Sequence, residues 1–166
     1  MKAILRYAIA GLFLILTPAV WALQDFEGQA HDFSTLLGQG DQWRVVMIWE
    51  SGCPACNHVA HRYVDFHEFN AEQRAAVLGI SIDGPARQAD AQAFIERHQV
   101  QFPNLIATPQ EAARLFRSLT GKPFLGTPSF LVFDPNGALR AFQAGPVPTD
   151  RLEQFILQAE SAAAAR

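Results

Sequence analysis

Two cysteines are the residues of this 166-residue chain whose type and spacing can do redox chemistry. Cys53 and Cys56 stand in one Cys-Pro-Ala-Cys segment, and the sequence contains no other cysteine. A disulfide that closes so small a ring constrains the unfolded chain little, so its value is chemical rather than structural. A lone vicinal pair of this kind is typical of a site that exchanges disulfides.

The place of the pair in the chain suggests a mechanism. Val45 to Trp49 is a continuous apolar run that predicts a strand buried on both faces, and Pro54 is suited to the first turn of a helix expected over residues 54–69. Cys53 therefore falls at a helix N-terminus, where free N–H groups and the helix dipole favour a thiolate. We expect Cys53 to be the attacking nucleophile and Cys56 to resolve the mixed disulfide.

The rest of the pattern predicts an α/β domain with a mixed central sheet flanked by helices. Strands joined through a helix should lie parallel, and a hairpin after Pro128 should add antiparallel strands. The segment from Asp25 to Gly40 is expected to be a polar lead without a strand. Further strands are expected at 76–82, 102–106, 129–133 and 138–142, and further helices at 86–98, 109–119 and from residue 149 onward.

The N-terminal segment predicts export. A basic start, an apolar run from Tyr7 to Leu16 and a small residue at Ala22 are typical of a signal peptide over residues 1–22. The wider apolar stretch from Tyr7 to Leu23 is just short of the roughly 20 residues that span a bilayer, so an uncleaved N-terminal anchor is the alternative. We expect one domain over residues 23–160 and a frayed tail over residues 161–166.

Composition argues against several other classes of protein. A formal net charge of -3 leaves no basic surplus for a phosphate backbone, so we expect no nucleic-acid partner. Zinc would need two ligands besides the cysteine pair, and covalent haem attachment would need histidine where Asn57 stands. We expect no metal site, because the histidines are spread over the lead and two helices without a common face; they are His31, His58, His61, His67 and His98.

Three segments resemble the TlpA-like periplasmic branch of the thioredoxin superfamily: residues 45–56, 79–83 and 126–134. The resemblance covers most of the chain after its N-terminal segment and implies a thioredoxin-like fold. It implies a thiol-disulfide oxidoreductase of the periplasm that needs no cofactor beyond a redox-active Cys53–Cys56 disulfide. The implied partners are cysteine-containing exported proteins and a membrane electron donor, with the protein acting as a reductant in cytochrome c maturation or in general disulfide reduction.

Individual residues carry this resemblance. Trp49 matches the aromatic residue that ends the strand before the cysteine pair in that branch. Thr127 and Pro128 match a dipeptide whose proline is cis and lies against the pair. A cis Pro128 would expose the Thr127 backbone for strand-like pairing with a substrate segment. Phe124 and Leu125 lie in the loop just before this dipeptide, and we expect them to contact the substrate.

The sequence also departs from the family pattern. Gly52 stands where the family usually has Trp, which suggests an open rim around the first cysteine. Met47 stands where thioredoxins carry a buried Asp that moves protons, so Glu50 and Asp83, near the ends of the two buried strands, are the candidates for that task.

Other functions remain open at this stage. An oxidase or isomerase would use the same cysteine pair, whereas a copper(I)-binding or redox-sensing module would be non-catalytic. A peroxidase of this fold is disfavoured, because peroxiredoxins place Thr at the position of Glu50. We expect a monomer that touches the membrane only through an uncleaved N-terminus.

Overall fold

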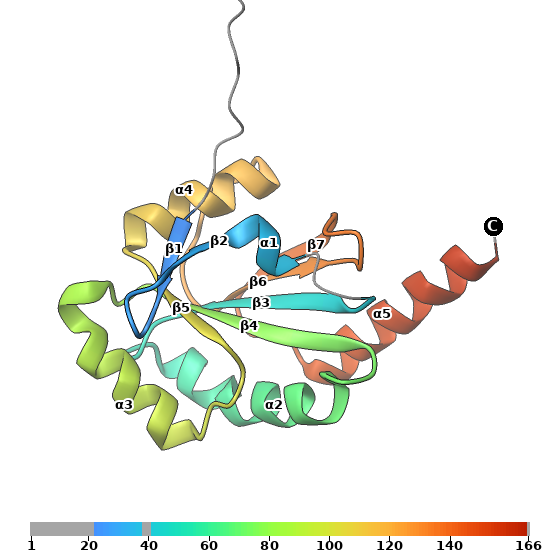
Figure 1. The fold of residues 1–166 in the computed structure, drawn as a ribbon. Helices are drawn as coiled ribbons and strands as arrows, with labels where there is room; N and C mark the ends of the chain where they lie inside the picture. Colours follow the sequence, from blue (N-terminus) through green and yellow to red (C-terminus); the bar gives the residue numbers. More distant parts are fainter. Residues whose placement is uncertain (1–21, 38–40, 166) are drawn as a thin grey trace, which may run out of the picture.

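The computed structural model of the protein describes residues 22–37 and 41–165 (Figure 1). Apart from Ala22, the predicted signal peptide or anchor lies outside these residues. Within them, no helix combines the length and the apolar character needed to cross a bilayer. The elements are, in order, β1 (Ala22–Asp25), β2 (Ala30–Asp32), α1 (Phe33–Leu37), β3 (Trp43–Trp49), α2 (Pro54–Asn70), β4 (Ala75–Ser81), a 3-10 turn (Pro85–Arg87), α3 (Gln88–His98), β5 (Asn104–Ile106), α4 (Pro109–Thr120), β6 (Ser129–Phe133), β7 (Leu139–Ala144) and α5 (Thr149–Ala164).

The strands form one mixed sheet of seven, in the order β2-β1-β5-β4-β3-β6-β7. β3, β4 and β5 are parallel neighbours. β6 runs antiparallel to β3 and is joined to β7 by an antiparallel hairpin. The predicted mixed sheet with a C-terminal hairpin is therefore confirmed, and β3, which leads into the cysteines, is held on both sides by other strands.

Helices cover both faces of this sheet (Figure 1). α2, α3 and α5 pack on one face, against Val45, Met47 and Trp49 of β3. α1 and α4 pack on the other face, against Val46 and Ile48. Successive residues of β3 point alternately into the two cores. Because both faces of the strand are covered, its sequence is apolar at consecutive positions.

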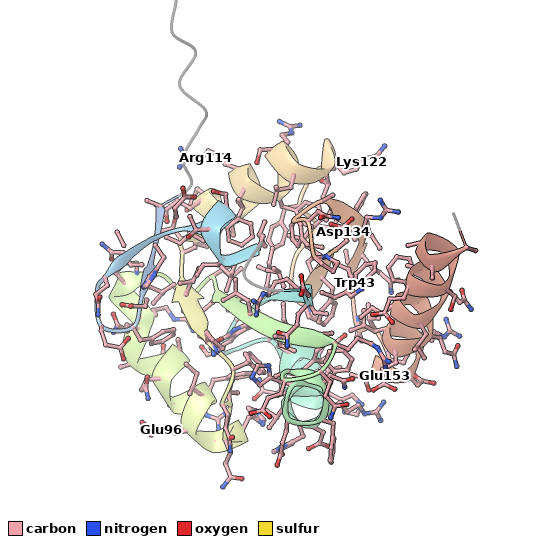
Figure 2. All side chains as sticks on the ribbon, turned by 45° about the vertical axis from the view of Figure 1, so that its right-hand side comes forward. Trp43, Glu96, Arg114, Lys122, Asp134 and Glu153 are labelled. Carbon is pink, nitrogen blue, oxygen red and sulfur yellow. The ribbon has the colours of Figure 1, made fainter. Side chains whose placement is uncertain are left out.

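The outer surface carries the charged side chains. Figure 2 shows Glu96 of α3, Arg114 of α4 and Glu153 of α5 projecting away from the molecule, and all three are exposed. Trp43, at the start of β3, lies inside and packs edge-on against Phe155 of α5. Each helix thus buries one side against the sheet and leaves the other to water.

Three details differ from the sequence prediction. The expected polar lead, from Asp25 to Gly40, begins at the last residue of β1 and contains β2 and α1, and β1 extends the sheet by pairing antiparallel with β5. The helical spacing of Val59, Tyr63, Phe66 and Phe69 predicts one apolar stripe on α2, yet Phe69 is 72% exposed, because it lies in the last turn of the helix. Residues 161–164, expected to fray, continue α5.

The absence of a side chain at Gly79 of β4 should be required for the close packing of β4 against Trp49 and Asn104. A Cβ atom added there would overlap the Asn104 side chain and lie 2.9 Å from Trp49 Nε1, two groups that are hydrogen-bonded to each other. Gly79→Ala should lower the free energy of unfolding by about 1–3 kcal/mol, measured by urea denaturation. Gly52→Ala is the matched control, because its Cβ would meet only Arg87 Nη2 at 3.9 Å. Equal midpoints for the two variants would contradict this account.

Candidate active site

Cys53 lies at the junction of β3 and α2. β3 ends at Trp49, a three-residue turn follows, and Cys53 is the N-cap of α2, with Pro54 in the first turn as predicted. The Cys56 backbone N–H donates to the Cys53 sulfur at 3.1 Å. The sulfur thus takes the place that a Ser or Asp oxygen usually fills at a helix start, where negative charge is favoured. Both cysteines are free thiols in the structure.

The two thiols differ in access, and burial suppresses the ionisation of the inner one. Cys53 retains 9% of its surface, whereas Cys56 is fully buried. Burial, and then the hydrogen bond with Cys53, raises the pKa of Cys56 to about 12. The Glu50 amide and the Thr127 side chain oppose this rise only in part. Cys56 is therefore a protonated thiol at neutral pH, and Cys53 is the member of the pair that an incoming group can meet.

The loop before β6 closes over the pair. The Thr127–Pro128 peptide bond is cis, as the resemblance implies. The Cys53 thiol donates to the Thr127 carbonyl oxygen at 3.4 Å. The Ser129 hydroxyl donates to the Gly126 carbonyl oxygen at 2.6 Å and holds the loop in place. A segment more than 70 residues away in sequence thus meets the Cys53 sulfur.

Asp83 anchors the turn that precedes Cys53. Its buried carboxylate accepts hydrogen bonds from the Ser51 amide at 2.9 Å, the Ser51 hydroxyl at 2.6 Å and the Ser81 hydroxyl at 2.9 Å. Arg87 pairs with Asp83 at 3.1 Å and with Glu50 at 3.2 Å. Among the described residues, neither carboxylate hydrogen-bonds to a cysteine sulfur. Proton transfer by Glu50 or Asp83 stays a prediction, and the contacts give Asp83 a positioning role.

The other residues expected around the pair differ in their surroundings. Trp49 is buried, donates to Asn104 Oδ1 at 3.0 Å and stacks on Phe94 with ring centres 4.3 Å apart. Met47 is also buried, within the core beneath the pair. Gly52 is exposed, as its departure from the family pattern suggested.

Phe124 and Leu125, in the loop before the cis peptide bond, differ in exposure. Leu125 is 78% exposed. Phe124 instead packs edge-on against Phe116 of α4, with ring centres 5.6 Å apart. Leu125 lies with Lys122 and Phe142 along a shallow surface groove between this loop and β7. Leu125 is therefore the residue of the two that is free to meet a partner.

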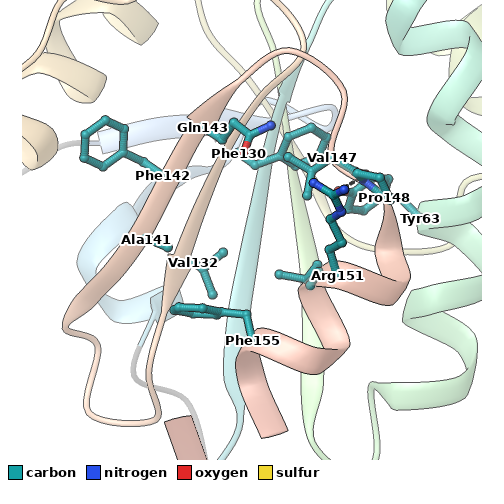
Figure 3. Close-up of a pocket in the computed structure, with 11 residues that line it drawn as sticks. Tyr63, Phe130, Val132, Ala141, Phe142, Gln143, Val147, Pro148, Arg151 and Phe155 are labelled. Carbon is teal, nitrogen blue, oxygen red and sulfur yellow. Dashed lines mark hydrogen bonds between the residues drawn. The ribbon is translucent and has the colours of Figure 1, made fainter. Parts of the chain in front are cut away.

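A separate apolar cavity of about 190 Å³ lies between the β6–β7 hairpin and α5 (Figure 3). Phe130, Ala141 and Phe155 line it, and Arg151 extends across it. The Tyr63 hydroxyl donates to the Val147 carbonyl oxygen at 3.0 Å. Neither cysteine borders this cavity, so it is a feature apart from the thiol site.

The structure corrects one prediction about the histidines. His61 of α2 and His98 of α3 have no common face in the sequence pattern, yet His61 Nε2 and His98 Nδ1 lie 3.4 Å apart. His98 Nε2 lies 2.9 Å from the side-chain oxygen of Asn57, the residue after Cys56. In the sequence, Asn57 indicated only that covalent haem attachment is excluded, and its contact with His98 was not foreseen. Among the described residues, no group of three or more His, Cys, Asp or Glu side chains is placed to hold a metal ion.

Solved structures similar to this chain share its fold. A thiol:disulfide interchange protein of the thioredoxin family from Chlorobium tepidum is 21% identical with a TM-score of 0.67, over 85% of this chain and 96% of that one. A secreted disulfide oxidoreductase from Mycobacterium tuberculosis is 18% identical with a TM-score of 0.64, over 82% and 94%. StoA from Bacillus subtilis is 16% identical with a TM-score of 0.62, over 83% and 96%. The predicted thioredoxin-like fold is confirmed.

The sequence places the chain within a family. The profile of the AhpC/TSA family matches residues 18–142, so the chain belongs to this family. No curated protein sequence matches the chain. The matched region includes both cysteines and the cis peptide bond described above.

Alkylation should distinguish the two thiols. Iodoacetamide should label Cys53 in the reduced protein at mildly acidic pH, because the α2 N-terminus favours negative charge at its sulfur and because it is the more exposed of the two thiols. Cys56 should stay unlabelled, since its pKa is about 12 and it is buried. Mass spectrometry of tryptic peptides measures the ratio, and Cys53→Ser is the control for background labelling. Equal labelling of both thiols would show that the helix start does not activate Cys53.

Proposed function

We propose that this protein is a thiol-disulfide oxidoreductase that exchanges disulfides with cysteines of exported proteins, and that it acts as a reductant. The observation that carries the proposal is the Cys53 sulfur, which accepts the Cys56 N–H at 3.1 Å and lies 3.4 Å from the carbonyl oxygen of the cis Thr127–Pro128 bond. This arrangement combines an outer sulfur at a helix N-terminus, a second thiol in reach and a backbone edge for a client.

The proposed reaction has two steps. The Cys53 thiolate attacks one sulfur of a client disulfide, forming a mixed disulfide and releasing the other client sulfur as a thiolate. Cys56 then loses its proton and attacks the Cys53 sulfur, which releases the second client thiolate and leaves a Cys53–Cys56 disulfide. Two electrons pass to the client, and an external dithiol must return them. Because the pKa of Cys56 is about 12, the second step needs a base, and we propose Glu50, Asp83 or water for this task.

Client binding is proposed at the loop before β6. The Thr127 backbone, beside Cys53, offers hydrogen bonds to an extended segment that carries the client cysteine. Leu125, with 78% of its surface exposed, provides an apolar contact next to it. Pro128 and Phe124 support this loop from within, and exposed Gly52 leaves the approach to Cys53 open.

The place and direction of the reaction extend the proposal. The apolar segment within residues 1–22 and the secreted relative from Mycobacterium tuberculosis support export to an oxidising compartment. A membrane electron donor is the proposed source of reducing power, because an exported reductant in such a compartment must be re-reduced from outside it. The resemblance to TlpA-like proteins supports the reducing direction.

Removing the second thiol should trap clients. Cys56→Ser cannot complete the second step, so client proteins should accumulate on Cys53 as mixed disulfides, seen on non-reducing gels and released by reductant. Cys53→Ser is the matched control and should trap nothing, because Cys56 is fully buried. Trapping by the Cys53→Ser variant instead would reverse the roles of the two cysteines.

The reduction potential should show the direction of electron flow. Equilibration with glutathione buffers should give a value near that of thioredoxin, about -270 mV, rather than that of a strong oxidant, about -120 mV. The reduced protein should also reduce insulin disulfides. A potential near that of the strong oxidant would overturn the proposed reducing direction. Tight retention of copper(I) without insulin reduction would favour a non-catalytic copper(I)-binding protein instead.

A further inference from the structure

The Asn57 side chain ties the turn that carries Cys53 to helix α2. Its Nδ2 donates to the carbonyl oxygens of Ser51 at 3.0 Å and of Cys53 at 2.9 Å. These two carbonyls flank Gly52, the most flexible residue of the turn. The Cys53 carbonyl also accepts the Asn57 backbone N–H at 3.1 Å. Both amide hydrogens of Asn57 are therefore used on the segment that sets the position of the attacking sulfur.

Helix α3 holds the other end of the same amide. His98 Nε2 lies 2.9 Å from Asn57 Oδ1, and Arg97 Nη1 donates to Oδ1 at 3.2 Å. Because an amide oxygen only accepts, His98 must carry a hydrogen on Nε2. All four hydrogen-bonding positions of the Asn57 side chain are thus filled, two by the cysteine turn and two by α3.

His98 is placed to change charge at this contact. It is 7% exposed, and its ring packs on Phe94 with ring centres 4.5 Å apart. The titratable and charged groups that face it are His61, from α2, and Arg97, from α3 itself. Burial, followed by the charges of His61 and Arg97, lowers the pKa of His98 from its ordinary value of 6.5. At neutral pH, His98 is therefore an uncharged donor to Asn57.

We propose that Asn57 is a positioning residue for Cys53 and that His98 makes its hold on the cysteine turn depend on pH. The inference rests on the function proposed for the Cys53–Cys56 pair. A protonated His98 donates to Asn57 through a charged N–H, which makes a shorter and stronger bond. It also adds positive charge near the start of α2, which favours the Cys53 thiolate. The protonated His98 also carries a hydrogen on Nδ1, which it can donate to His61 Nε2, 3.4 Å away.

The Asn57 arm of the test compares two asparagines of the same helix. Asn57→Ala should slow alkylation of Cys53 by iodoacetamide at neutral pH roughly tenfold, because the loosened turn weakens the Cys56 N–H contact with its sulfur. Asn70→Ala is the matched control. The Asn70 side-chain amide donates one hydrogen bond, to the Phe66 carbonyl oxygen at 2.9 Å, at the far end of α2. Thermal unfolding verifies that each variant is folded. Equal alkylation rates for the two variants would overturn the positioning role.

The His98 arm separates hydrogen bonding from charge. Gln places a side-chain N–H near the position of the imidazole Nε2 but does not titrate. In His98→Gln, Cys53 should therefore be alkylated at the wild-type rate at about pH 8, and this rate should fall more steeply than in the wild type toward about pH 5.5. His98→Ala should be slower at both pH values, and it carries the test if Asn57→Ala does not fold. His58→Gln, at an exposed histidine of α2, is the control. A His98→Gln profile that superimposes on the wild type would overturn the pH dependence.

The two proposals can fail separately. Alkylation needs no client, whereas insulin reduction by the wild-type protein tests the proposed function. If the wild type fails to reduce insulin while Asn57→Ala still slows alkylation, the positioning role stands and the oxidoreductase proposal falls. If the wild type reduces insulin and Asn57→Ala alkylates at the rate of Asn70→Ala, only the positioning role falls.

Discussion

The hydrogen bond from the Cys56 amide to the Cys53 sulfur is the contact on which the site depends, because it joins the sulfur to the electropositive end of α2. The contact exists only while the turn before the helix keeps its shape. Asp83 holds this turn from the end of β4, Asn57 from within α2 and Thr127 from the loop before β6. The sheet order, with β3 between β4 and β6, brings these three supports around one sulfur.

Much of the fold could be predicted because its strongest patterns are local. The apolar run of β3 and the Pro at the start of α2 are properties of short windows, and so is the capping box of Thr108 and Glu111 at the start of α4. β1 and β2 could not be found in this way. β1 buries only Leu23; it pairs with β2 on one side, and on the other it joins the sheet through β5, which lies some 80 residues further along the chain. Pairing over that distance leaves no pattern in the segment itself.

The same distinction applies to the site. Cys53 and Cys56 were evident because four adjacent residues define them, and the cis peptide at Pro128 followed from a family resemblance. The contact between His98 and Asn57 depends on the distance and rotation between α2 and α3. Side chains set that packing across the whole helix interface, and a single sequence contains no direct record of it. Residues that support the site from neighbouring elements are therefore visible only in three dimensions.

The complete burial of Cys56 beside a partly open Cys53 also affects damage by oxidants. A peroxide that reaches the outer sulfur would convert it to a sulfenic acid, which can be lost irreversibly if a second oxidant arrives first. Here the neighbouring inner thiol can condense with it and expel water, closing the ring before that happens. The shielded sulfur can thus return the pair to a disulfide, a form that a dithiol of lower reduction potential reduces again.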